Sequence, residues 1–166
     1  MISSFAAWIF SALVGLAVVT WSSDPWGEVI VDREGRVVWA QRTPPNRSSM
    51  HARVARDGRT LLLDRNSFWP TLDQGEASTI DQSTIDGAVV HTFLTPGMHH
   101  PFTDLPDGSI AYGAAVGGYI DGDEILRIVH LDGTTEDLWS CETWLATIGV
   151  DDNCDSNTLT YHEATN

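Results

Sequence analysis

The chain has 166 residues, of which 42% are hydrophobic and 19% are charged, a composition typical of one globular domain with a hydrophobic core. It carries 23 Asp and Glu against 9 Lys and Arg, which gives a net charge of −14. This balance argues against nucleic acid as a partner, because binding to a phosphate backbone needs basic patches.

The first element is an apolar segment at residues 5–21, FAAWIFSALVGLAVVTW. It contains no charge and is at the short end of the length of a membrane-spanning helix. No Lys or Arg precedes it and no Ala-x-Ala site follows it, so we expect residues 1–24 to be a transmembrane anchor or uncleaved signal first and a cleaved signal peptide second. A buried core helix is the third interpretation. The first two would leave the chain membrane-anchored or secreted, with residues 25–166 in the periplasm or outside the cell.

The remainder is predicted to be all-β. Its turns are marked by glycines, most of which follow Asp, between short runs of alternating or β-branched residues, and this pattern is typical of β-hairpins. The five turn glycines are Gly35, Gly58, Gly87, Gly108 and Gly133.

The hairpins alternate between two types, which indicates a larger repeat. Alternate turn glycines lie 52, 50 and 46 residues apart, so one repeat holds two hairpins, or four strands, the size of a β-propeller blade. We therefore expect residues 25–166 to be a partial β-propeller of about three four-stranded blades, the last incomplete, behind an N-terminal hydrophobic helix. Because closed propellers have about four to eight blades, unpaired terminal strand edges could mediate self-association. A β-sandwich is the alternative.

Histidines recur at the start of one hairpin type. Met50-His51 and Met98-His99-His100 lead into equivalent hairpins of consecutive repeats, which a sandwich would not explain. In a propeller such positions converge around one axis. The simpler interpretation is that each imidazole bonds a neighbouring backbone carbonyl.

Three stretches resemble the arylsulfotransferase family: IDGAVVHTFLTPGMHHPFTDLPDGSIAYG at 85–113, DEILRIVHLDGTTEDLWS at 123–140 and DSNTLTY at 155–161. The resemblance covers roughly residues 26–166. It implies an extracytoplasmic propeller that transfers a sulfuryl group between phenols through a sulfohistidine, so that the small-molecule partners would be an aryl sulfate and a phenol.

The resemblance implies site residues within two motifs. The family's His-His-Asp motif corresponds to residues 99–101, and its Asp-Trp-x-His-x-Asn motif corresponds to residues 152–157. His99, His100, Asp155 and Asn157 are therefore the catalytic candidates, and His51 is the candidate for substrate binding.

Two positions depart from the family pattern. Pro101 stands where the family has Asp, and Asp155 stands where it has His, which puts a negative charge beside an anionic substrate. The family's later site residues, a nucleophilic histidine and an arginine, belong to further blades. We therefore expect this chain alone to be inactive. The alternative function is a non-catalytic binding or surface-interaction propeller.

No cofactor is implied, although the acidic loop offers one weak alternative. Oxygen ligands at every second position resemble a Ca²⁺ loop, but the loop lacks the expected glycine and bidentate Glu, so a solvated loop is favoured. The four residues are Asp151, Asn153, Asp155 and Asn157.

The two cysteines, Cys141 and Cys154, lie 13 residues apart, and outside the cytoplasm such a pair predicts one disulfide. In the cytoplasm they would be two free thiols. Zinc is disfavoured because no Cys-x-x-Cys pair and no histidine at ligand spacing accompany them.

Overall fold

A computed structural model describes residues 16–18, 26–67, 75–117, 122–152, 154, 156 and 158–162. Within these ranges the chain is almost entirely β, as predicted, with eleven strands and one helix. The strands are β1 (Leu16–Val18), β2 (Trp26–Val31), β3 (Val37–Arg42), β4 (Ala52–Val54), β5 (Thr60–Arg65), β6 (Thr79–Thr84), β7 (Val89–Leu94), β8 (Met98–Asp104), β9 (Ile110–Val116), β10 (Asp123–Val129) and β11 (Thr135–Ser140). The helix, α3 (Cys141–Ile148), follows β11 directly.

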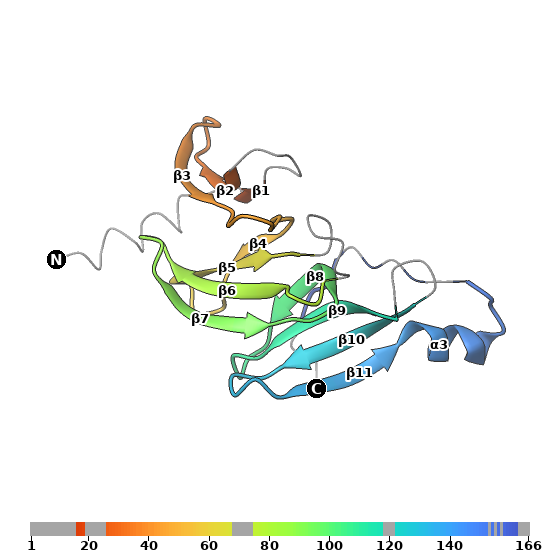
Figure 1. The fold of residues 1–166 in the computed structure, drawn as a ribbon. Helices are drawn as coiled ribbons and strands as arrows, with labels where there is room; N and C mark the ends of the chain where they lie inside the picture. The colour runs from red at the N-terminus through yellow and green to blue at the C-terminus, as the bar shows by residue number, and fades with distance from the viewer. Residues whose placement is uncertain are drawn as a thin grey trace.

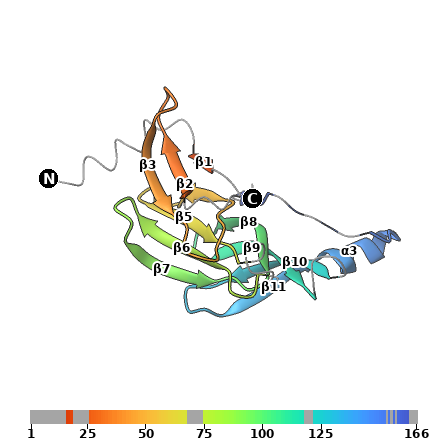
Figure 2. The same ribbon diagram turned by 45° about the horizontal axis from the view of Figure 1, so that its top comes forward.

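The strands form three antiparallel sheets in chain order. The first sheet is β1-β2-β3, the second is β4-β5-β6-β7 and the third is β8-β9-β10-β11. Figure 1 shows the first sheet at the top, the second in the middle and the third below, and Figure 2 shows the same succession from another direction. Each of the five predicted turns joins the two strands of a hairpin. The alternation of hairpins seen in the sequence therefore reflects four-stranded sheets.

The structure does not show the predicted N-terminal hydrophobic helix. Of residues 5–21 the structure describes only Leu16–Val18, and these residues form β1, which pairs antiparallel with β2. This difference has a physical reason, since pairing with β2 satisfies backbone groups that would otherwise lie on an open sheet edge. Among the described residues, no helix is long and apolar enough to cross a membrane. The expected boundary between residues 24 and 25 lies outside the described residues.

Two apolar clusters hold the sheets together. The larger cluster joins the second sheet to the third and includes Leu62, Phe93 and Tyr112, each at most 2% exposed. The smaller cluster joins the first sheet to the second through Ile30, against which Trp39 packs. Every residue of β5 and β8 is buried. β5 and β8 therefore lie in the interior, and two of the predicted histidines, His99 and His100, lie on β8.

A buried ion-pair network also joins the first sheet to the second. Arg65 on β5, only 2% exposed, donates from Nη1 to the carboxylate of Glu28 on β2 and from Nε to Asp81 on β6 at 3.3 Å. Burial raises the pKa of the Glu28 carboxyl above its usual range, against the opposing effect of the Arg65 charge. Removing either partner would leave an uncompensated charge in the interior.

The disulfide predicted from the sequence is confirmed. Cys141 and Cys154 are bonded, with their Cα atoms 6.1 Å apart. Cys141 is the first residue of α3, whose N-terminus is capped by the Ser140 hydroxyl accepting from the Thr143 backbone N–H. The Asp123 carboxylate accepts from the Glu142 backbone N–H at 2.8 Å. The span between the cysteines is thus fixed at its start to β10 and closed by the disulfide.

We expect Arg65→Met to destabilise the protein by about 3–5 kcal/mol, because the buried Glu28 carboxylate and the half-buried Asp81 carboxylate would lose their cation. Urea unfolding followed by tryptophan fluorescence measures the change. Arg36→Ala is the control, since the Arg36 side chain is 73% exposed in its ion pair with Asp32, and its loss should leave stability nearly unchanged. Equal effects of the two substitutions would contradict a role for the buried network.

We expect Cys141→Ala/Cys154→Ala to lower the free energy of unfolding by about 3 kcal/mol, the loop-closure contribution of a disulfide of this span. Unfolding in urea of the oxidised wild type and the double variant gives the difference. Mass spectrometry of non-reduced peptides should find residues 141 and 154 in one linked species, and two free thiols in native protein would exclude the bond.

Candidate functional site

The predicted histidines lie where the chain leads into the second and third sheets. His51 immediately precedes β4 and is half-buried, whereas His99 and His100 lie within β8 and are only 2% and 9% exposed. We call Met50-His51 and Met98-His99-His100 the lead-in segments of the second and third sheets. Both segments supply imidazoles at the start of the first strand of a sheet.

A bulge in β8 presents the histidine pair. Met98 pairs with Ala114 and Phe102 pairs with Tyr112, so residues 99–101 lie opposite Gly113 alone. The two imidazole rings have centroids 4.0 Å apart and are tilted by 50°. Bulges redirect side chains and are frequent beside active sites. Regular pairing would place adjacent side chains on opposite faces of the sheet, whereas the bulge brings these two rings into contact.

The histidines of neighbouring sheets are electrostatically coupled. Burial lowers the pKa of His51, and positive charge on His100 and Arg53 lowers it further. His51 is therefore neutral to a lower pH than an ordinary histidine. The imidazoles of two consecutive sheets thus act on one another electrostatically.

A buried carboxylate fixes the backbone at His51. Asp64 on β5 is fully buried, and it accepts hydrogen bonds from the Ser49 hydroxyl at 2.7 Å and from the backbone N–H groups of Met50 and His51 at 2.9 and 3.0 Å. Burial raises the Asp64 pKa to about 7, despite these donors, and the nearby Glu28 charge adds to the rise. Asp64 thus fixes the backbone position of His51, from which the imidazole side chain extends.

A second buried side chain fixes the lead-in segment of the third sheet. Asn66, which follows β5, donates from Nδ2 to the carbonyl oxygens of Met98 at 3.1 Å and His99 at 2.9 Å. The second sheet therefore positions both lead-in segments, its own through Asp64 and that of the third sheet through Asn66.

A third segment reaches the bulge from the C-terminal side. The Glu124 carboxylate on β10 accepts from the backbone N–H of Ser156 at 2.9 Å and from its hydroxyl. A Cβ atom on Gly113 would lie 3.0 Å from Pro101 Cγ and 3.1 Å from Glu124 Oε1, so these two side chains meet over the glycine. Ser156 thereby lies near the bulge that carries the histidine pair.

The other predicted site residues cannot be placed in this arrangement. Asn153, Asp155 and Asn157 lie outside the described residues, and Asp151 is exposed. Among the residues that the structure describes, no group of three or more His, Cys, Asp or Glu side chains could hold a metal ion.

Sequence reasoning missed the polar side chains that organise the site. Arg53, Asp64, Asn66 and Glu124 carry no motif. The one signal available in the sequence was at Asp64, a carboxylate that directly follows the apolar run 61–63.

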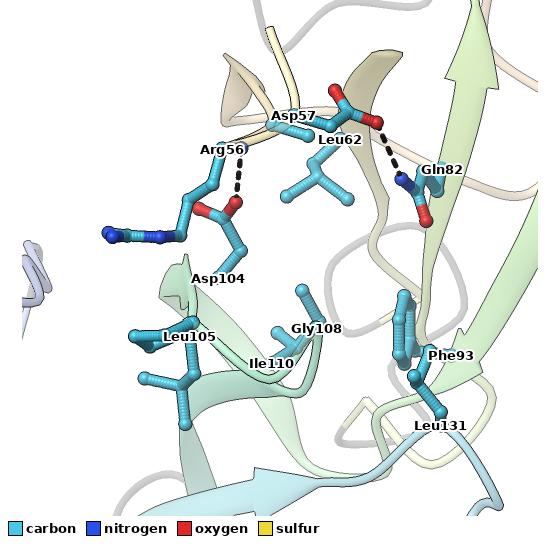
Figure 3. A pocket seen from close by; sticks show the side chains of 12 residues that line it. Arg56, Asp57, Leu62, Gln82, Phe93, Asp104, Leu105, Gly108, Ile110 and Leu131 are labelled. Atoms are coloured by element: carbon cyan, nitrogen blue, oxygen red, sulfur yellow. Dashed lines mark hydrogen bonds between the residues drawn. The ribbon is translucent and has the colours of Figure 1, made fainter. Parts of the chain in front are cut away.

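A cleft of about 550 Å³ lies between the second and third sheets, at the opposite end of β4 and β8 from the histidines. Figure 3 shows apolar Leu62, Phe93 and Ile110 in its wall and charged side chains at its rim. Asp104 accepts from the Arg56 backbone N–H at 2.6 Å, which ties two turns together. The Asp104 carboxylate at the rim of the cleft thus has a structural role. The histidine cluster, which consists of His51, His99 and His100, is therefore the better candidate site.

Comparisons with known proteins do not assign a family. No protein-family model and no curated protein matches the chain. A crystal structure of a protein of unknown function from Bacteroides caccae is similar, with 20% sequence identity and a TM-score of 0.48. The match covers 70% of this chain and 38% of that one, so this chain spans less than half the length of the similar protein.

We expect Asp64→Asn to change how stability depends on pH. Because the folded-state pKa of Asp64 is raised to about 7, the stability associated with its neutral form is present at low pH and is lost as pH rises toward 7. Asparagine keeps an oxygen acceptor without the charge, so the variant should gain stability relative to the wild type as pH rises from about 4, the ordinary pKa of Asp, to about 7, and the difference should stay constant above pH 7. Urea unfolding at several pH values measures the difference, and a difference independent of pH would contradict the buried acid.

Proposed function

We propose that the three sheets are successive blades of a partial β-propeller and that the lead-in segments meet near its axis. Two features support the proposal. Each four-stranded sheet is an antiparallel meander in chain order, and the most buried strands, β5 in the second sheet and β8 in the third, are the second and first strands of their sheets, as near a propeller axis. The links from Asn66 to Met98 and from Glu124 to Ser156 connect each lead-in segment to the preceding sheet.

We further propose that the histidine cluster binds the sulfuryl group of an aryl sulfate, in the manner of the arylsulfotransferase-like site that the sequence resembles. The observation that carries the proposal is the bulged His99-His100 pair coupled to His51 of the neighbouring sheet. Imidazoles can donate hydrogen bonds to partly anionic oxygens, and a neutral imidazole can attack sulfur. Arg53 adds positive potential at His51, which partly offsets the acidic character of the chain.

The same geometry favours binding over turnover for this chain alone. The resemblance assigns the nucleophilic histidine and an arginine to later blades, and the described residues contain no fourth sheet facing the histidine pair. The histidine cluster of this chain could hold the sulfuryl oxygens, but it would not complete the transfer to a phenol.

A specific observation favours a second candidate, a non-catalytic binding propeller. Pro101 occupies the family's aspartate position and packs over Gly113 beside the Glu124 carboxylate. A carboxylate there disfavours a sulfate by like-charge repulsion and suits a neutral or cationic ligand. Failure to bind aryl sulfates together with binding of a neutral phenol or Ca²⁺ in calorimetry would favour this candidate.

We expect the purified chain to bind 4-nitrophenyl sulfate about tenfold more tightly at pH 5 than at pH 8, a change of about 1.4 kcal/mol, because protonated His51 attracts the sulfate. The lowered pKa of His51 places its contribution at the acidic end of this range. Equilibrium dialysis measures binding, and His99→Ala/His100→Ala should abolish it. His91→Ala is the matched control, because His91 lies on the outer strand β7.

Transfer from 4-nitrophenyl sulfate to a phenol should be absent in the same preparations. Turnover that disappears in His99→Ala/His100→Ala would show that the site is complete within this chain. Binding that is unaffected by pH and by both histidine substitutions would refute the proposed sulfate site.

A further inference from the structure

The third sheet is followed by an addition that the second sheet lacks. Residues 95–97 alone connect β7 to β8, whereas β11 continues into α3 and a span closed by the disulfide. Figures 1 and 2 show α3 at the far end of the third sheet. The buried residues of α3 are Cys141 and Leu145, so the rest of the helix contributes little to the core. Because connecting segments often carry binding residues, this addition is a candidate for a second site.

The addition and the strand before it expose two tryptophans. Trp139, near the end of β11, is 40% exposed, and Trp144 on α3 is 48% exposed. Their ring centroids lie 6.3 Å apart and the ring planes are tilted by 47°. Tryptophan is highly buried on average in folded proteins, so two neighbouring exposed indoles are unusual. Together they form an aromatic surface that another molecule can reach.

These two indoles line a cleft of about 510 Å³ between the third sheet and α3, which we call the tryptophan cleft. Small-molecule sites have volumes of roughly 300–1,000 Å³ and walls that are mostly apolar, with a few polar groups. The tryptophan cleft fits this description. Its other lining residues are two apolar side chains, three hydroxyl side chains and one carboxylate: Ile125, Leu138, Ser140, Thr143, Thr147 and Asp137.

The walls of the tryptophan cleft are held in place by the protein itself. The disulfide anchors the first residue of α3, and the Ser140 hydroxyl caps the helix. The Asp123 carboxylate on β10 accepts from the Glu142 backbone N–H at 2.8 Å, which ties α3 to the sheet. Trp144 lies within one turn of these contacts. A pre-organised site of this kind loses less conformational entropy when a ligand binds.

The described residues that line the tryptophan cleft present no unpaired charge. Asp137 is the charged residue among them, and Arg127 on β10 donates to its two carboxylate oxygens at 2.5 and 3.0 Å. In a bidentate pair of this kind the two charges compensate each other. A charged ligand would therefore find no free counter-charge in the cleft, whereas a neutral ligand needs none.

The hydroxyl groups of the tryptophan cleft retain hydrogen-bonding capacity. The Ser140 hydroxyl donates to the Thr143 hydroxyl oxygen at 2.9 Å, which leaves the Thr143 hydroxyl hydrogen available to a ligand. The Thr147 hydroxyl donates to the carbonyl oxygen of Trp144 at 2.6 Å, which leaves its own lone pairs available. The cleft thus offers both a donor and an acceptor beside the two indoles.

We propose that the tryptophan cleft binds a neutral saccharide. The C–H groups on one face of a sugar ring pack on the negatively polarised face of an indole, and the ring hydroxyls both donate and accept hydrogen bonds. Trp139 and Trp144 match the first property, and Thr143 and Thr147 match the second. A purely apolar ligand would instead bury these hydroxyls without partners, which is unfavourable. The proposal is independent of the sulfate site at the histidine cluster.

Isothermal titration calorimetry of the full chain, in a detergent without a sugar headgroup, tests the proposal. The probes are neutral hexasaccharides of glucose, xylose, mannose, galactose and N-acetylglucosamine. We expect saturable binding of at least one of them, with a dissociation constant of about 1 mM or below. Trp139→Ala and Trp144→Ala should each weaken this binding at least about tenfold, as for aromatic residues at the centre of a binding site.

Two variants serve as controls. Ile148→Ala removes an apolar side chain of α3 that is 53% exposed and lies outside the lining of the cleft, so saccharide binding should be unchanged. His99→Ala/His100→Ala should also leave it unchanged, which separates this site from the proposed sulfate site. Circular dichroism establishes that each variant folds.

Absence of saturable binding to every probe would overturn the proposal. Binding that survives both tryptophan substitutions would overturn it as well, as would an equal loss of affinity in Ile148→Ala.

Discussion

The guanidinium of Arg65 lies between the carboxylates of Glu28 and Asp81, in a position closed to solvent, and the arrangement of the first two sheets depends on it. A cation so deeply buried must be compensated, and the two acids come from different sheets. The Glu28 carboxylate also acts on the site, because its charge contributes to the raised pKa of Asp64, which accepts from the backbone N–H of His51.

Buried polar side chains hold the backbone of the site in position, and the site does not depend on contacts among the histidines. Asp64 holds the segment before β4, Asn66 holds the start of β8, and Glu124 holds Ser156. Buried polar groups need partners, so each of these side chains allows few backbone positions. Gly113 completes the arrangement, because a Cβ atom there would lie only 3.0 Å from Pro101 and 3.1 Å from Glu124, so that both side chains would have to shift.

Charge is distributed unevenly along the chain, and this affects the proposed sulfate site. Arginines gather in the first two sheets, including Arg53 beside His51, while the third sheet and the residues that follow it are acidic. The side of the histidine cluster formed by the second sheet therefore suits an anion, and the side near Glu124 opposes one.

The sequence by itself determined the strands, the turns, the four-strand period and the disulfide, because hairpin glycines, residue alternation and cysteine spacing are local signals. It also indicated that His51, His99 and His100 would converge. Only the tertiary structure decided how they are held, since a bulge depends on the register between two strands and a buried acid such as Asp64 depends on which donors reach it. Leu16–Val18 illustrates the same limit: its composition favoured a helix, and pairing with β2 made it a strand.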